Sequence, residues 1–264
     1  MRTSGVITIT TDFGHKGPFA AVMKGVILSR FPDARVIDLA HDIPAQWPPE
    51  AGFWVSRSYQ WFPDGSVHLA IVDPGVGTER DILIVEYDHH YFMAPDNGLL
   101  GRLLDGADNA AVFTLDMDAL ERLNIETPSN TFHGRDIFAP VAAELAAGKT
   151  TPVCIGKATD TWTPAWIDEP DVSSAKVSGS IITVDAFGNL ISNIDGSLIE
   201  GFRNPVAHIA GHDIALQTTY GNVQPGEYLA LVNSFGVIEI AKSESNAAEG
   251  LGVERGAPIT VTDT

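Results

Sequence analysis

The order of strand-like and helical segments is the feature that most limits what this chain can fold into. In residues 5–148, short apolar or alternating runs are interleaved with runs that repeat apolar residues at helical spacing. The predicted strands are 5–12, 34–40, 66–73, 81–87 and 91–96, and the predicted helices are 17–31, 49–62, 98–106 and 135–148. This β-α-β-α-β order predicts an α/β fold, in which a mostly parallel sheet carries helices on both faces.

The pattern changes near residue 150. Residues 161–174 hold two prolines and two tryptophans without a period, and the short runs beyond residue 175 are rich in β-formers and separated by Gly, Asn and Pro. Such runs without a long helix predict a smaller all-β barrel. We therefore predict an α/β catalytic domain over 1–160, a linker over 161–176 and a β-barrel domain over 177–264.

Charge and cysteine content limit the partners and the compartment. The net charge of −18, from 16 basic and 34 acidic residues, gives a surface that repels a phosphate backbone, so we expect no nucleic-acid partner. No signal peptide is recognisable and no apolar stretch approaches the ~18 residues of a membrane span, so we expect no membrane contact. The single cysteine, Cys154, fits a reducing cytoplasm, and we expect it to be a small buried residue.

Three aspartates follow predicted strands: Asp12 in "TTDFG", Asp73 in "VDPGVG" and Asp96 in "APDNG". Because ligands of open α/β sheets bind at the carboxyl ends of strands, the three acids suggest one shared site. Each could instead cap a helix or form a turn. The turn interpretation is favoured for Asp96, since Asp-Asn-Gly is typical of turns, and both interpretations stay open for Asp12.

The loop "DPGVGTER" does not match the known phosphate-binding loops. It lacks the Lys-Ser or Lys-Thr pair of a P-loop, lacks the third glycine of a dinucleotide-binding loop, and leads into a strand rather than a helix. Its glycines are therefore expected to serve tight backbone geometry. The eight histidines show no spacing typical of metal ligands, so we expect no metal site.

His133, in "TFHGRDIFAP", precedes a predicted helix. The positive end of a helix lowers the pKa of a histidine and favours the neutral form that a general base needs. A solvated capping histidine explains the same position equally well, so both interpretations stay open.

Six motifs then occur in order along nearly the whole chain: "TDFG", "VDPGVGTER", "PDNG", "TFHGRDIFAP", "DAFGNLISNI" and "NSFG". Together they resemble the S-adenosylmethionine hydroxide adenosyltransferase family, the hydrolytic relatives of fluorinase and chlorinase. The resemblance implies an N-terminal α/β domain, a C-terminal β-barrel and a homotrimer whose sites lie between the N-terminal domain of one subunit and the C-terminal domain of its neighbour. It implies hydrolysis of S-adenosyl-L-methionine to adenosine and methionine, with this molecule as substrate and without a cofactor.

The resemblance places a catalytic Asp-Arg-His set on Asp73, Arg80 and His133. Halogenating relatives carry Tyr at the position of Asp73, and fluorinase also has Ser at Gly134 and Thr at Val76. This chain has none of the three residues, nor the long insertion of fluorinase, so the implied nucleophile is water.

The resemblance also implies substrate contacts from the N-terminal domain. Asp12 would accept both ribose hydroxyls, and Thr131 and Phe132 would line the ribose end. An aromatic residue near the ribose falls on Trp47, although one extra residue in this segment leaves Gln46 as the alternative.

From the C-terminal domain, the resemblance implies that Asp185 binds the methionine ammonium and Ser234 its carboxylate. The adenine would be held by Phe187, Asn189 and Tyr220. Fluorinase has Arg where this chain has Phe235, so a backbone contact is retained there and a side-chain charge is lost.

The chemistry of a sulfonium agrees with this set. A thioether leaves as a neutral group and needs no general acid, and a low-polarity site favours attack by hydroxide on a cation. Arg80 stays protonated and is no base, but its charge lowers the pKa of a bound water. Our hypothesis is that Asp73 and Arg80 fix the water and His133 completes the network.

Three alternatives remain open from the sequence. The chain could be a halogenase of the chlorinase type, since chlorinase also has Gly at the position of Gly134. It could bind adenosine or S-adenosylmethionine without turnover, or it could be an unrelated metal-dependent hydrolase.

Overall fold

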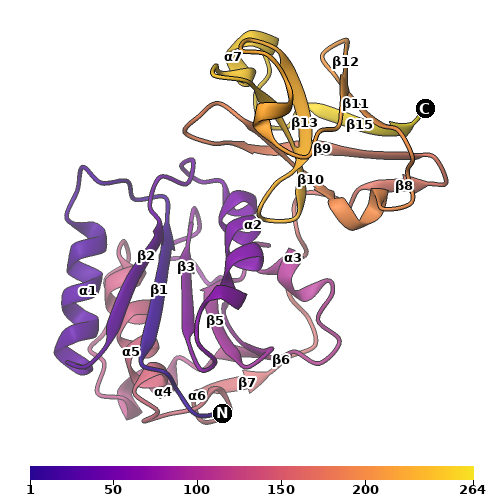
Figure 1. Cartoon of the computed structure of the whole chain (residues 1–264). Coiled ribbons are helices and arrows are strands. Elements are labelled where there is room, and N and C mark those ends of the chain that lie inside the picture. Colours follow the sequence, from indigo (N-terminus) through magenta and orange to yellow (C-terminus); the bar gives the residue numbers. More distant parts are fainter. The chain divides into compact units, whose positions relative to one another are not determined.

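The computed structural model describes residues 1–264, and the chain divides into two compact units, Met1–Trp166 and Ile167–Thr264 (Figure 1). The segment predicted as a linker is shared between them. Residues 161–166 belong to the first unit, and strand β8 (Asp171–Ser173) pairs with β9 (Lys176–Val184) in the second. The observed boundary therefore falls inside the segment 161–176.

The first unit contains the alternating strands and helices expected from the sequence. Its strands are β1 (Val6–Thr11), β2 (Arg35–Ala40), β3 (Val67–Ile71), β4 (Ile82–Tyr87), β5 (His90–Pro95), β6 (Ala111–Leu115) and β7 (Gly156–Ala158). Its helices are α1 (Phe19–Arg30), α2 (Pro48–Ser58), α3 (Gly101–Leu104), α4 (Asp118–Arg122), α5 (Ala139–Ala146) and α6 (Pro152–Ile155). The short turn η1 (Tyr59–Trp61) follows α2, and the turn η2 (Gly134–Phe138) precedes α5.

These strands form one sheet in the order β2-β1-β3-β5-β4-β6-β7. Strands β2, β1, β3 and β5 pair in parallel, whereas β4 lies antiparallel between β5 and β6, and β7 is antiparallel to β6. The sheet is therefore mostly parallel in strand direction, and the expected fold class is confirmed. The carboxyl ends of β1, β3 and β5 lie side by side at one edge.

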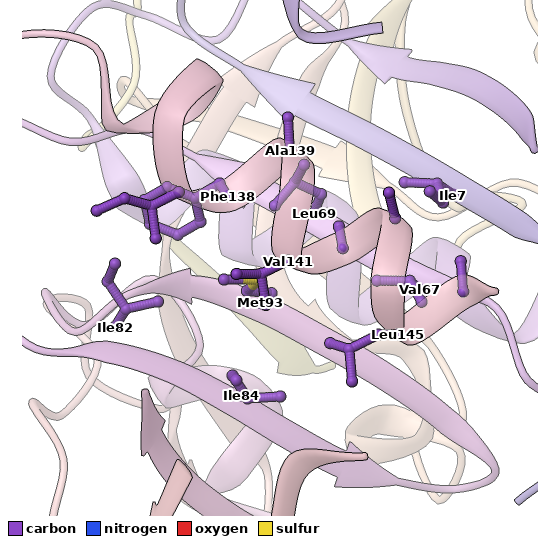
Figure 2. Close-up of a cluster of buried hydrophobic side chains, with 14 of the residues drawn as sticks. Ile7, Val67, Leu69, Ile82, Ile84, Met93, Phe138, Ala139, Val141 and Leu145 are labelled. Carbon is purple, nitrogen blue, oxygen red and sulfur yellow. The ribbon is translucent and has the colours of Figure 1, made fainter. Parts of the chain in front are cut away.

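Helices cover both faces of this sheet because the strands are apolar on both sides. On one face, side chains of α1 and α5 pack against the strands; Figure 2 shows this cluster, with the labelled residues Ile7, Val67, Leu69, Ile82, Ile84, Met93, Phe138, Ala139, Val141 and Leu145. On the other face, α2 and α3 cover the alternate residues of the same strands, such as Ala70 of β3 and Val85 of β4. Because both faces of the sheet are packed against helices, the strand ends that carry the candidate site have fixed positions.

Several elements were not predicted. Strands β6 and β7 and helices α4 and α6 have three to five residues each, too short for a clear period. The predicted helix 135–148 is a π-helical turn, η2, followed by α5, and π-turns are frequent at functional sites. Cys154 is exposed, so the expectation that it is buried is wrong: in the short helix α6 only Pro152 and Ile155 face inward.

The second unit is an antiparallel sheet that curls toward a barrel. Its further elements are β10 (Leu190–Asp195), β11 (Pro205–Ile209), β12 (His212–Ala215), β13 (Tyr228–Val232), β14 (Val237–Lys242), β15 (Pro258–Asp263), α7 (Ala247–Leu251) and the turns η3 (Gly196–Ile199) and η4 (Tyr220–Asn222). The order is β12-β11-β15-β9-β10-β14-β13, with β8 beside β9. The N–H of Gln217, just after β12, donates to the carbonyl of Ala230 in β13 at 2.7 Å and so joins the two ends. The expected small β-barrel is confirmed.

None of the helices combines the length and the apolar character that crossing a membrane requires.

Candidate active site

A cavity of about 370 Å³ lies at the carboxyl ends of β1 and β3 in the first unit. It is lined by Asp12, Phe13, Phe19, Gln46, Ile71, Asp73, Pro74, Val76, Thr131, Phe132, His133 and Gly134. Five of the predicted site residues therefore share one cavity: Asp12, Asp73, Thr131, Phe132 and His133. This location follows the general rule for ligand sites of open α/β sheets.

Asp73 and Arg80 form a two-pronged ion pair beside the cavity. Arg80 Nε donates to Asp73 Oδ1 at 3.0 Å, and Arg80 Nη2 donates to Asp73 Oδ2 at 2.5 Å. The two side chains are only 7% and 12% exposed. A guanidinium held by two parallel bonds to one carboxylate has a defined orientation, which a single contact would not give.

The same guanidinium also holds His133. Arg80 Nη2 lies 3.0 Å from His133 Nδ1. Because a guanidinium can only donate, Nδ1 is the acceptor, and a neutral His133 carries its proton on Nε2. The ring makes no capping bond to η2, so the capping interpretation of His133 is not what the structure shows.

Burial of the ring and the charge of Arg80 lower the pKa of His133, and Asp73 and Asp136 oppose this shift. The direction agrees with the expectation from the sequence. His133 is therefore neutral at neutral pH, as its contact with Arg80 requires.

The glycines of "DPGVGTER" bring this loop to His133. Gly77 has a φ of +79°, and a Cβ on it would lie 2.1 Å from the carbonyl oxygen of Asn130, close in sequence to His133. Only glycine permits both this backbone conformation and this close approach. Arg80 also lies over the ring of Phe138 at 5.8 Å, a contact that the sequence did not reveal.

Asp12 lies in the cavity rather than at a helix end. Its Oδ2 accepts the backbone N–H of Gln46 at 2.9 Å, whereas the residue before helix α1 is Pro18. Gln46 lines the cavity, and Trp47 instead packs edge-on against Trp166 with ring centres 5.9 Å apart. Between the two alternatives, Gln46 is the residue that the structure brings to the cavity.

Asp96 does not reach the cavity. Its Oδ1 accepts the N–H of Thr163 at 2.8 Å, and its carbonyl accepts the Thr163 hydroxyl. It thereby holds the segment that leaves the first unit, which agrees with its interpretation as a turn residue.

Three of the predicted residues of the C-terminal unit share one hydrogen-bonded turn. Asp185 Oδ1 accepts the N–H groups of Phe187 and Asn189, both at 2.9 Å, and its Oδ2 accepts Asn189 Nδ2 at 3.0 Å. These bonds hold the "DAFGN" turn in a fixed shape. The Phe187 side chain projects from this turn and is 78% exposed.

Of the remaining C-terminal candidates, Tyr220 contacts a carboxylate that the sequence did not single out. Tyr220 donates its hydroxyl hydrogen to Glu239 Oε1 at 2.7 Å, and Ser234 and Phe235 lie in the turn between β13 and β14. Glu239 is 3% exposed in the middle of β14. A charged residue inside an otherwise apolar strand, "VIEIAK", is the signal by which it could have been found.

The side chains form no group of three or more His, Cys, Asp or Glu that could hold a metal ion. Beside the cavity, Asp73 and His133 are both paired with Arg80. The arrangement offers one fixed cation, two carboxylates and a neutral imidazole around a small open space.

Comparison with known proteins shows the family of this chain. Residues 7–155 match the SAM hydroxide adenosyltransferase N-terminal domain, and residues 179–260 match the corresponding C-terminal domain. The chain belongs to this family. The similarity extends to curated members of the SAM hydroxide adenosyltransferase family and to solved structures.

The (R)-S-adenosyl-L-methionine hydrolase of Salinispora tropica is 36% identical over 97% of this chain and 97% of its own length. The enzyme of the same name from Thermus thermophilus is 35% identical over 94% of this chain and 96% of its own. A crystal structure of an uncharacterized conserved protein from Thermotoga maritima superposes with a TM-score of 0.89 at 32% identity, over 97% of this chain and 99% of that chain.

Proposed function

We propose that this chain hydrolyses S-adenosyl-L-methionine by attack of water or hydroxide at the ribose C5′ carbon, which gives adenosine and L-methionine. The observation that carries the proposal is the Asp73–Arg80–His133 network beside a cavity that also holds Asp12. The names of the relatives from Salinispora and Thermus support the same reaction.

In this reaction the nucleophile's oxygen forms a bond to C5′ while the C5′–S bond breaks. The bonding pair passes to sulfur, which leaves as the neutral thioether of methionine, and one proton is released. No general acid is needed, because the leaving group carries no negative charge. Loss of charge between hydroxide and sulfonium is favoured in a site with little bulk water.

The network suggests a role for each of its members. The charge of Arg80 stabilises hydroxide over water, and Asp73 fixes the guanidinium with both oxygens. His133 presents no lone pair on Nδ1, since Arg80 occupies it, so we assign it to orient the nucleophile from the Nε2 side. The proton lost by the water then passes to solvent. If Arg80→Ala and His133→Ala both kept full turnover, these roles would be wrong.

We assign the substrate contacts from the hydrogen-bonding atoms that each polar group does not already use within the protein. Asp12 uses Oδ2 for Gln46, which leaves Oδ1 for a ribose hydroxyl. Thr131 and Phe132 line the same cavity. We assign Asp185 and Ser234 to the methionine end, with Phe187, Asn189, Tyr220 and the backbone at Phe235 on the adenosine side. Trp47 packs against Trp166, so we assign the ribose contact of this segment to Gln46.

We further propose that the chain acts in the cytoplasm as a homotrimer, in which the C-terminal domain of one subunit completes the cavity of its neighbour. Two observations support self-association. Phe187 and Tyr220 are 78% and 47% exposed, as expected for side chains that recognise a ligand held by another subunit. Helix α1 also exposes the apolar residues Phe19, Val22 and Leu28.

A product assay tests the activity. The protein is incubated with S-adenosyl-L-methionine, with both sulfonium epimers compared because the relatives' names specify (R), and the products are separated by chromatography. Adenosine and methionine in equal amounts support the proposal, and unchanged substrate would show a binding protein instead. A 5′-halo-adenosine formed with chloride or fluoride would show a halogenase. Loss of turnover with a strong chelator would show a metal-dependent enzyme.

A further inference from the structure

Hydrogen bonds from Tyr220 and Asn233 to the buried Glu239 fix the direction in which Tyr220 donates. Glu239 Oε1 accepts the Tyr220 hydroxyl at 2.7 Å, and Oε2 accepts Asn233 Nδ2 at 3.1 Å. Both partners are neutral side chains. Burial and the nearby charge of Asp185 raise the pKa of Glu239, while its two donors favour the ionised form.

The direction of these hydrogen bonds is set at Asn233. The carbonyl oxygen of the Asn233 side chain accepts the backbone N–H groups of Phe235 at 2.9 Å and Val237 at 3.3 Å. Its NH2 group is therefore turned toward Glu239. Glu239 accepts from Tyr220 as well, so the hydroxyl hydrogen of Tyr220 points at Glu239.

The Tyr220 hydroxyl can therefore act toward a ligand only as a hydrogen-bond acceptor. The residue is 47% exposed, so a ligand can approach it. A ligand group that donates a hydrogen finds an acceptor there. A ligand group that itself accepts finds no hydrogen, and both groups stay unpaired.

We propose that Glu239 is a positioning residue that sets base specificity: it holds Tyr220 as an acceptor, so that the site takes a purine with an exocyclic amino group and rejects one with an oxo group in its place. The inference rests on the proposed function, under which Tyr220 contacts the adenine. Sites that hydrogen-bond a substrate group discriminate strongly against analogues that leave the protein group unpaired.

The substitution Glu239→Gln tests this polarity. Asn233 still needs an acceptor, so the carbonyl oxygen of the new amide faces Asn233 and its NH2 group faces Tyr220. The Tyr220 hydroxyl then accepts from the amide and turns its hydrogen outward. The same side chain would thus favour an oxo group over an amino group.

The measurement is the ratio of the dissociation constants of adenosine and inosine, taken by calorimetry, together with the ratio of kcat/KM for S-adenosyl- and S-inosyl-L-methionine. We expect the native chain to favour the amino form by about 10-fold or more, and Glu239→Gln to reduce this preference at least about 10-fold. Tyr220→Phe should weaken discrimination as well, and it tests the inference even if Glu239→Gln does not fold. The control is Glu227→Gln, because Glu227 is exposed and accepts only a local N–H, so its loss removes one negative charge without touching Tyr220.

An adenosine-to-inosine ratio that is unchanged in both Glu239→Gln and Tyr220→Phe would overturn the inference. A merely structural role of Glu239 would weaken both nucleosides equally and would also leave the ratio unchanged. Failure of the proposed function looks different: the native chain would not cleave S-adenosyl-L-methionine, while the binding ratio would still report on Glu239.

Discussion

The Asp73 carboxylate uses both of its oxygens to hold one guanidinium, so its charge matters as much as its shape. In Asp73→Asn, one oxygen becomes an NH2 group that repels Arg80, and the fixed cation is lost from the cavity. We expect kcat to fall on the order of 10²-fold or more, as when a group that stabilises developing charge is removed.

The matched control is Asp96→Asn, at the end of the adjacent parallel strand. Asp96 needs only an acceptor for the N–H of Thr163, which the asparagine carbonyl still provides. Steady-state kinetics of the two variants compare an aspartate of the network with an aspartate of a turn. Equal losses in both would contradict the assignment of Asp73.

Protonation of His133 should lower the activity at acidic pH. Burial and the charge of Arg80 hold the pKa of His133 below its usual 6.5, and the neutral ring is the form that accepts from Arg80. Activity should therefore be complete above the pKa of His133 and decline as the pH falls through it. We expect the midpoint of kcat/KM below 6.5, measured as a pH–rate profile.

A change at Arg80 separates charge from geometry. Arg80→Gln removes the cation while Asp73 stays, so the pKa of His133 should rise. Arg80→Lys keeps the charge and should leave that pKa closer to the native one. NMR titration of the His133 ring distinguishes the two, and a pKa that falls in Arg80→Gln would contradict the assigned cause.

At the scale of elements, the loop between β3 and β4 depends on one glycine. In Gly77→Ala the Cβ would lie 2.1 Å from the Asn130 carbonyl oxygen, at a φ that alanine rarely adopts. The loop must shift, which separates Arg80 from His133. We expect a loss of at least about 1 kcal/mol in the free energy of unfolding, with most of the activity lost.

Gly75→Ala provides the control within the same loop. Its φ is not in the left-handed region, and its Cβ would make contacts no closer than 3.4 Å. Chemical denaturation and kinetics of both variants test the point. If Gly75→Ala proved as damaging as Gly77→Ala, the close approach at Asn130 would not be the reason.

At the scale of the whole molecule, the proposed shared site predicts complementation between two inactive variants. His133→Ala damages only the N-terminal part of a site, and Asp185→Ala damages only the C-terminal part. In mixed trimers, about a quarter of the sites would combine an intact N-terminal domain with an intact C-terminal domain of the neighbour.

Co-expression of the two variants, with light scattering to determine the oligomeric state, tests this prediction. Each variant alone should be inactive, and the mixture should recover part of the native activity. No recovery from a confirmed mixed trimer would mean that each site lies within one chain.

The sequence determined much of this protein by itself. Period and turn chemistry predicted the parallel strands β1, β3 and β5, because long apolar runs and their flanking breaks are local properties. They also placed Asp12 and Asp73 at the ends of predicted strands, favoured a turn role for Asp96, and indicated the β-rich second unit. The six motifs identified the family.

Only the tertiary structure decided which polar groups meet. Arg80 and His133 are 53 positions apart, and their contact depends on how Gly77 packs against Asn130. The choice between Gln46 and Trp47 required the direction of each side chain, and the exposure of Cys154 required the packing of α6. Glu239 was missed because a lone acid in a strand acquires meaning only from the partners across the sheet. Local pattern sets the elements, whereas hydrogen-bond polarity and burial arise from contacts between residues distant in sequence.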